Sequence, residues 1–302
     1  MTRRPRRALD GRPSLRFAAG WLALREDLDR AARNRVLARA LAQRLPNDPH
    51  LLDLGAGAGG LFRFLAPIIG RSQTWTFADA DESLLYTALA LTASWARRRG
   101  FAATSPRGAG GSSLVLGTPS GSWRIETLVS DLAEMPRGLP LQAVDAVVCS
   151  ALLDLVSRSW MERLVAALRV PFYASMTVDG RDAWLPRHAA DRAIRTAFRA
   201  DQRRDKGLGM ALGDGAPDLV LRLLAARGFE THTATSDWNI PGSAASLSRL
   251  LVGMTAGPAR QAMPAQAAKF TTWSGARLNQ SARARLAIRI GHRDILAFPR
   301  AG

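Results

Sequence analysis

The chain of 302 residues contains a single cysteine, Cys149, and only four histidines. One cysteine excludes an intrachain disulfide and argues against a cysteine-based metal site. The histidines are too scattered along the sequence to suggest a set of metal ligands, so no metal is expected. Because Cys149 lies within an apolar run, we expect it to be a small core residue and not a nucleophile.

Long apolar runs are also missing. No stretch approaches 18 uninterrupted apolar residues, so a membrane span is not expected, and neither is a membrane partner. Arginines cluster near residue 5, but the apolar stretch after them is cut short by Arg25, Glu26 and Asp27, which does not fit an export signal. We therefore expect a cytoplasmic protein, long enough to bury the core of one domain with additions.

Acidic residues are scarce relative to basic ones, 25 against 42, which gives a formal net charge of +17. Such a balance favours contact with phosphates and therefore makes RNA a candidate partner. The arginines are scattered, however, and aromatic residues, on which bases could stack, make up only 7% of the chain. A small-molecule substrate is therefore the favoured expectation, and RNA the lesser one.

The most informative stretch is LLDLGAGAGG, residues 51–60. An apolar run, a glycine-rich turn and renewed apolar periodicity predict a strand, a tight loop and a helix. Glycine lets such a loop adopt positive φ angles and bring its backbone against a ligand. The N–H groups that begin the following helix favour an anionic group of that ligand.

The glycines at 55, 57 and 60 also satisfy the G-x-G-x-x-G pattern of dinucleotide-binding proteins. Asp53 argues against that interpretation, because a carboxylate there would repel a pyrophosphate but suits a ligand bearing a sulfonium and an ammonium. The stretch resembles motif I of the class I S-adenosylmethionine-dependent methyltransferases. The resemblance implies that Asp53, Gly55, Gly57 and Gly59 surround the methionine end of S-adenosyl-L-methionine.

A second acid follows at the end of the next predicted strand, TWTFAD, residues 74–79. Asp79 stands where an α/β fold places the acceptor for a ribose diol, and its neighbour Ala80 is expected beside the same ligand. Asp81 is expected to cap the helix that follows.

A third acid, Asp131, ends the β-rich run WRIETLVSDL, residues 123–132. In the family resembled, an acid at this place accepts a hydrogen bond from the adenine amino group, and the backbone N–H of the next residue meets a ring nitrogen. The resemblance assigns these roles to Asp131 and Leu132. It also implies a cofactor contact from Ser150, the last residue of the apolar strand 144–150.

Acids and glycines at the ends of successive parallel strands converge on one crevice. With a fifth strand at 169–178, the order of these matches predicts an α/β protein. We expect a seven-stranded, mostly parallel Rossmann-like sheet with helices on both faces, in which strands six and seven pair antiparallel, as in the family resembled.

The remaining segments divide the chain coarsely. Residues 1–14 are expected to be a disordered arm and residues 15–44 an N-terminal helical cap, which either covers the ligands or packs on the sheet. Residues 45–302 form the expected methyltransferase domain. Its charged, glycine-containing insertion 180–217 is expected to recognise the substrate as a lid.

Methyl transfer from a sulfonium is an in-line displacement, so a base is needed only for an acceptor that is protonated. Asp154, after the fourth strand, and His188, in the insertion, are the candidate catalytic residues. The more usual role of an acid at the place of Asp154 is a solvated helix start, and a capping or exposed role is the alternative for His188. Arg203 and Arg204 could clamp a carboxylate or phosphate of the substrate, or form a solvated helix face.

These observations predict an S-adenosylmethionine-dependent methyltransferase acting on a small, anionic or hydroxylated metabolite. One alternative is a methyltransferase acting on RNA or protein. A second is a non-catalytic cofactor-binding scaffold, which the intact acids at 53, 79 and 131 disfavour. The sequence does not indicate the oligomeric state.

Overall fold

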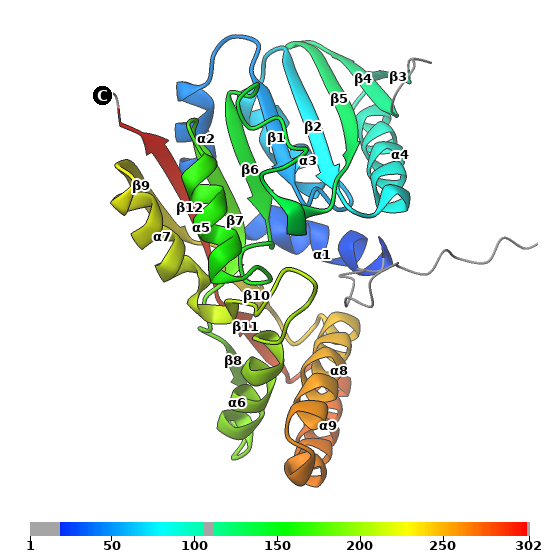
Figure 1. Ribbon diagram of the computed structural model, residues 1–302. Helices are drawn as coiled ribbons and strands as arrows, with labels where there is room; N and C mark the ends of the chain where they lie inside the picture. Colours follow the sequence, from blue (N-terminus) through cyan, green and yellow to red (C-terminus); the bar gives the residue numbers. More distant parts are fainter. Residues whose placement is uncertain (1–18, 106–111, 301–302) are drawn as a thin grey trace, which may run out of the picture.

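A nine-stranded sheet between two layers of helices forms the larger part of the molecule (Figure 1). The computed structural model describes residues 19–105 and 112–300, so the arm predicted over residues 1–14 lies outside the described residues. The strands, in spatial order, are β3 (Ala102–Thr104), β4 (Ser113–Thr118), β5 (Gly121–Val129), β2 (Gln73–Asp79), β1 (His50–Leu54), β6 (Ala146–Ser150), β7 (Phe172–Val178), β12 (His292–Pro299) and β9 (Phe229–Thr235).

The five strands from β5 to β7 run parallel to one another, whereas β12 is antiparallel to both of its neighbours, β7 and β9. The predicted mostly parallel sheet with an antiparallel final pair is therefore confirmed. The predicted count of seven strands is wrong, because β3 and β4 extend the sheet antiparallel beyond β5. Their glycine- and serine-rich surroundings hide the strand pattern in the sequence.

Helices cover both faces of the sheet because successive strand residues point to opposite sides. Leu51 belongs to a core shared with Phe62, and its neighbour Leu52 to a second core shared with Trp160. Cys149 is buried in this second core. The helices α2 (Arg35–Arg44), α3 (Gly60–Ile69) and α4 (Glu82–Arg98) pack on the first face, and α5 (Arg158–Ala167) and α7 (Ala216–Ala226) on the second.

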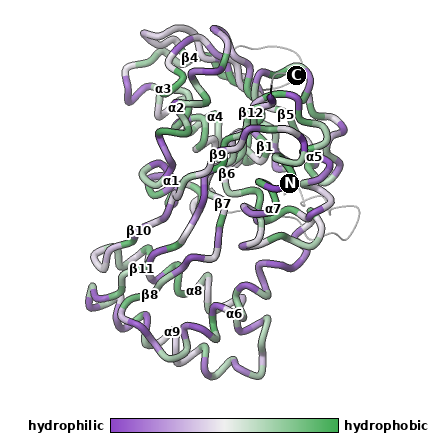
Figure 2. Tube along the Cα trace, turned by 90° about the vertical axis from the view of Figure 1, so that its left-hand side faces the viewer, coloured by the Kyte–Doolittle hydropathy of each residue, from purple (hydrophilic) through white to green (hydrophobic). Residues whose placement is uncertain are grey.

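A smaller unit lies beyond the carboxyl ends of the parallel strands, as both ribbon and tube show (Figures 1 and 2). It has its own core, which includes Trp184, Phe270 and Trp273. Its elements are the antiparallel strands β8 (Ala183–Leu185), β10 (Trp238–Ile240) and β11 (Ala287–Ile290), with the helices α6 (Asp191–Gln202), α8 (Ala245–Ala262) and α9 (Ala267–Ala282). The insertion 180–217 thus supplies only part of this unit. Short 3-10 turns complete the described chain: η1 (Leu132–Glu134), η2 (Gly213–Gly215) and η3 (Pro264–Gln266).

The helix α1 (Ala19–Ala32) lies between the sheet and the smaller unit, across the carboxyl ends of the strands (Figure 1). Trp21 and Leu28 pack against the core of the smaller unit. The segment 15–44, predicted as a cap of one or two helices, holds two helices with different places, since α2 packs on the sheet.

Gly59, the residue before α3, offers a test of local packing. Its φ is +77°, and an added Cβ would lie 3.1 Å from Phe77 and 3.2 Å from Arg63. Gly138 has a similar φ of +74° but nothing within 4 Å of its Cβ position. We expect Gly138→Ala to cost only the left-handed backbone penalty, about 1–2 kcal/mol, and Gly59→Ala about 1–3 kcal/mol more from crowding. Thermal unfolding of the two variants measures the difference, and equal losses would contradict the packing described.

Candidate functional site

The glycine loop between β1 and α3 is held in a conformation that requires glycine. Gly55, Gly57 and Gly59 all have positive φ, at +65°, +54° and +77°. The N–H groups of Gly55 and Ala56 both donate to the carbonyl of Ala78, at 2.8 and 3.2 Å. The loop is thereby fixed beside the carboxyl ends of β1 and β2.

Asp53, in β1 just before this loop, is a buried carboxylate without a donor. It is 1% exposed, and neither carboxylate oxygen has a hydrogen-bond partner among the described residues. Burial raises the pKa of Asp53 well above its ordinary value, the positive charge of Arg33 acts to lower it, and the charge of Asp79 raises it further. Because an unsatisfied buried carboxylate costs free energy, its presence indicates a place where a ligand brings donors or positive charge.

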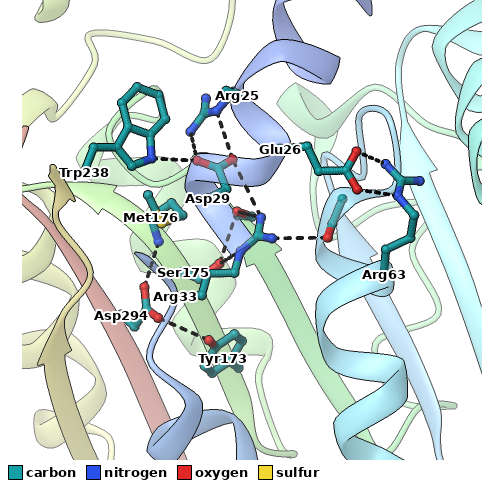
Figure 3. Close-up of polar contacts among 12 residues, drawn as sticks. Arg25, Glu26, Asp29, Arg33, Arg63, Tyr173, Ser175, Met176, Trp238 and Asp294 are labelled. Atoms are coloured by element: carbon teal, nitrogen blue, oxygen red, sulfur yellow. Dashed lines mark hydrogen bonds and ion pairs between the residues drawn. The ribbon is translucent and has the colours of Figure 1, made fainter. Parts of the chain in front are cut away.

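Arg33, which follows α1, brings a buried positive charge near Asp53. Figure 3 shows its guanidinium and the polar groups around it. Arg33 is 5% exposed, and its guanidinium donates to the hydroxyl of Ser150 at 2.9 Å, to the hydroxyl of Ser175 at 3.2 Å and to the carbonyl of Gly60 at 3.1 Å. These partners belong to β6, β7 and the first turn of α3. Sequence reasoning missed Arg33, since no local pattern marks it within the predicted cap.

The helix α1 covers the glycine loop. An added Cβ on Gly57 would lie 3.5 Å from the side chain of Leu22. Glu26 forms two hydrogen bonds with the guanidinium of Arg63, both at 2.6 Å, and so ties α1 to α3 (Figure 3). Of the two interpretations of the N-terminal cap, α1 fits the covering one and α2 fits packing on the sheet.

Asp79, at the end of β2, is fixed by backbone groups. Its Oδ2 accepts from the N–H of Gly57 and its Oδ1 from the N–H of Asp81, each at 3.0 Å. Burial raises the pKa of Asp79, and these backbone hydrogen bonds act to lower it. A carboxylate has about four acceptor positions, so capacity remains for a ligand. Ala80, beside it, is exposed.

Asp131 and Leu132 follow β5 at the same edge of the sheet. Asp131 is exposed, and its Oδ1 accepts from the N–H of Ala133 at 2.9 Å. Leu132 is buried, with its side chain 3.8 Å from the Cβ position of Gly55 and its carbonyl accepting from the indole of Trp160. The structure thus brings the predicted residues at the ends of β1, β2, β5 and β6 to one edge of the sheet.

Asp154, in the loop after β6, also has a buried carboxylate oxygen, Oδ1, that lacks a hydrogen-bond partner among the described residues. Burial raises the pKa of Asp154 to about 6, although a backbone hydrogen bond and the positive charges of Arg25 and Lys206 act to lower it. A carboxylate with this pKa is suited to exchanging protons near neutral pH.

The other catalytic candidate, His188, lies at the start of α6 in the smaller unit. Its Nδ1 accepts from the N–H of Ala190 at 3.1 Å, and its own N–H donates to Asp191 at 2.8 Å. These contacts hold the turn before α6, whose N-cap residue is Ala190 and not His188.

The two arginines expected to clamp a substrate have acidic partners of their own. Arg203 pairs with Asp214 at 2.9 Å and Arg204 with Asp201 at 3.4 Å, and both arginine side chains are more than half exposed. No hydrogen bond or ion pair within residues 19–105 and 112–300 joins either arginine, or His188, to the three acids at the strand ends.

Two further properties concern the described part of the chain as a whole. It contains no group of three or more His, Cys, Asp or Glu side chains that could hold a metal ion. None of its helices combines the length and the apolar character needed to cross a membrane.

Comparison with known proteins gives similarity of structure alone, because no family model and no curated protein sequence matches the chain. A cyclopropane-fatty-acyl-phospholipid synthase-like protein from Lactobacillus casei is 13% identical, with 90% of this chain and 92% of that chain covered and a TM-score of 0.49. A putative type II methyltransferase from Anaeromyxobacter dehalogenans is 15% identical, with 88% and 97% covered and a TM-score of 0.47. Geranyl diphosphate C-methyltransferase from Streptomyces coelicolor is 12% identical, with 88% and 79% covered and a TM-score of 0.42.

The unsatisfied carboxylate of Asp53 should lower the stability of the ligand-free protein. Since the folded-state pKa is raised, the folded protein binds the Asp53 proton more tightly than the unfolded chain does. That stabilisation is present at low pH and is lost as the pH rises from about 4, the unfolded value, through the folded-state pKa. We therefore expect Asp53→Asn to raise the melting temperature at neutral pH by a few degrees, roughly 2–4 °C per kcal/mol.

Thermal unfolding at several pH values measures this effect, and the gain should disappear below pH ~4, where Asp53 becomes protonated in both states. Asp48→Asn, at an exposed position, is the control and should have little effect at any pH. A less stable Asp53→Asn protein at neutral pH would show that the carboxylate has a favourable partner.

Proposed function

We propose that the protein is a class I S-adenosylmethionine-dependent methyltransferase. The observation that carries the proposal is the buried, unpartnered carboxylate of Asp53 next to the glycine loop and near the guanidinium of Arg33. This pair of opposite charges suits the ammonium and carboxylate of an amino acid. Arg33 uses three of its five N–H donors in hydrogen bonds to other described residues, which leaves donors for a carboxylate. A pyrophosphate would instead meet the negative charge of Asp53.

The remaining contacts of the cofactor follow the order of the strands. Asp79 would accept hydrogen bonds from the ribose hydroxyls, with Ala80 alongside. Asp131 would accept from the adenine amino group, and the backbone N–H of Leu132 would meet the ring. Gly55, Gly57 and Gly59 would allow the loop backbone to approach the methionine portion, and Ser150 would contact it beside Arg33.

When bound, S-adenosylmethionine supplies a methyl group on a positively charged sulfur. The task of the protein is then to align the acceptor with that methyl group and to exclude water. The helix α1, tied to α3 by Glu26 and Arg63, provides the exclusion on the side of the glycine loop.

The proposed acceptor is a small anionic or hydroxylated metabolite. Asp154 would accept the proton that a hydroxyl acceptor loses, since its carboxylate lies after β6 at the same edge of the sheet and has an unpartnered oxygen. The positive charges of Arg25 and Lys206 that act on Asp154 would favour an anionic group on the acceptor. Arg203 and Arg204 remain candidates for binding that group, although each already has an acidic partner.

Removing the proposed ribose acceptor should weaken cofactor binding. We expect Asp79→Ala to lose about 1.5–3 kcal/mol of binding free energy for S-adenosylhomocysteine, the range for hydrogen bonds to a charged group. Calorimetry measures the affinity.

The Asp131→Asn variant should also bind S-adenosylhomocysteine more weakly, because its amide can present a donor to the adenine amino group. If the folded variants bind S-adenosylhomocysteine with unchanged affinity, Asp79 and Asp131 do not contact the cofactor. Tighter binding of NAD than of S-adenosylhomocysteine would overturn the cofactor assignment.

The proposed base should give the reaction a recognisable pH dependence. Because Asp154 acts only when ionised, kcat/KM should rise with pH through about 6 and then level off. Asp154→Asn should lose this rise and roughly 10²–10⁴-fold in rate, with cofactor affinity unchanged.

The assay follows label from methyl-labelled S-adenosylmethionine into small-molecule, RNA and protein fractions of a cell extract. Label in the RNA or protein fraction would select that alternative acceptor class, and binding without transfer to any fraction would favour the scaffold. A wild-type pH profile that is flat near 6 would exclude Asp154 as the base.

A further inference from the structure

The C-terminal part of the smaller unit has a charge distribution unlike that of the rest of the chain. Residues 238–293 contain no aspartate and no glutamate. The same stretch contains eight basic residues: Arg249, Arg260, Lys269, Arg277, Arg283, Arg285, Arg289 and Arg293. Within the described residues, only Arg277 and Arg293 of these eight form ion pairs. The other six are positive charges that no acidic side chain of residues 19–105 and 112–300 pairs with.

Two of these unpaired charges line a pocket at the end of α9. The pocket has a volume of about 220 Å³ and is lined by Pro186, Asn279, Gln280, Arg283 and Arg285. Apart from the proline, each lining side chain offers N–H donors, and none is acidic. This set of donors suits a phosphate-like anion.

The wall of the pocket is held by a third guanidinium. Arg277 is fully buried and pairs with Asp191, and its Nη1 donates both to the carbonyl of Pro186 and to the side-chain oxygen of Gln280. Its Nε is buried and has no hydrogen-bond partner in the part of the chain that the structure describes. Two of the pocket residues are therefore fixed by the core of the smaller unit.

Exposed apolar side chains accompany the pocket. Leu185 immediately precedes Pro186 and is 52% exposed, and Leu278 precedes Asn279 and is 39% exposed. Leu250 and Met254, one turn apart on α8, are also exposed, and α8 and α9 lie side by side (Figure 1). Four of the nine large hydrophobic side chains found exposed in the described chain thus belong to this one unit. Leu185 and Leu278 each adjoin a pocket residue in the sequence, so exposed apolar side chains accompany unpaired positive charges, the composition of a surface that lies at a lipid interface.

We propose that this end of the smaller unit docks on an anionic phospholipid surface. The pocket at Arg283 and Arg285 would take a headgroup phosphate, and Leu185 and Leu278 would enter the interfacial region of the lipid. A protein can bind the surface of a membrane without a helix that spans it. This proposal therefore takes the place of the expectation that no membrane partner exists.

Two other occupants fit the surface less well. A second copy of the chain that met this surface through the same surface would bring unpaired positive charges against positive charges, which is unfavourable. RNA would match the charge, but the aromatic side chains of α9, Phe270 and Trp273, are fully buried and provide no stacking surface.

Sedimentation of the full chain with vesicles tests the proposal. We expect binding to vesicles that mix phosphatidylcholine with phosphatidylglycerol, and none to phosphatidylcholine alone. Replacing both pocket arginines, Arg283→Gln with Arg285→Gln, should lower the partition coefficient about tenfold or more, since each basic residue near the surface contributes to attraction. Leu185→Ser with Leu278→Ser should weaken binding to the same vesicles while leaving the net charge unaltered.

Matched controls separate a specific surface from general basicity. Arg97→Gln with Arg98→Gln removes the same charge from the end of α4, and Val36→Ser removes an exposed apolar side chain from α2. Both controls should bind vesicles as the original protein does. Equal losses in the controls, or no binding to anionic vesicles, would overturn the proposal.

Competition identifies the ligand source. Inorganic phosphate should displace the protein from vesicles only weakly, because it lacks the apolar contacts of a lipid. If inorganic phosphate alone binds the pocket and vesicles do not, the site is for free phosphate. If bulk tRNA binds and is lost in the Arg283/Arg285 variant while vesicles are ignored, the partner is RNA. None of these outcomes depends on methyl transfer, so the proposed function is tested separately.

Discussion

The buried guanidinium of Arg33 is the interaction on which the arrangement of the site depends. Burying a positive charge is costly unless hydrogen bonds and an opposite charge compensate. Arg33 meets both needs, through three oxygen acceptors and through Asp29, whose carboxylate lies 3.8 Å away. Its positive charge also partly offsets the cost of leaving Asp53 unpartnered. The same group therefore positions α1 and makes a strongly charged edge of the sheet compatible with folding.

The surrounding polar contacts hold the same helix from other directions (Figure 3). Asp29 accepts from the indole of Trp238 at 2.9 Å and thereby joins α1 to the smaller unit. The buried carboxylate of Asp294, in β12, accepts from the N–H of Asn34 and from the N–H of Met176. The segment from α1 to α2 is thus attached to both the sheet and the smaller unit, and any ligand of Asp53 would lie within this framework.

The sequence predicted those features that are local in the chain. The glycine loop and the acids at 53, 79 and 131 are recognisable because strand, turn and charge follow one another within ten residues. Arg33 was not recognisable, because Ser150 and Ser175 are 117 and 142 positions away. The smaller unit was also missed as a unit, since its strands come from three distant segments and no single segment shows its core. The strand count was wrong because β3 and β4 pair at an irregular, glycine-rich edge.

The position of β12 has a consequence for the order in which the molecule can be built. This strand comes last in chain order, yet it lies between β7 and β9 and pairs with both. Until it emerges from the ribosome, β9 has no partner in the sheet and one edge of β7 is uncovered. Every residue of the smaller unit has by then been synthesised. The larger sheet is therefore completed only after the whole smaller unit has been made. Exposed strand edges at that stage are the features that chaperones protect.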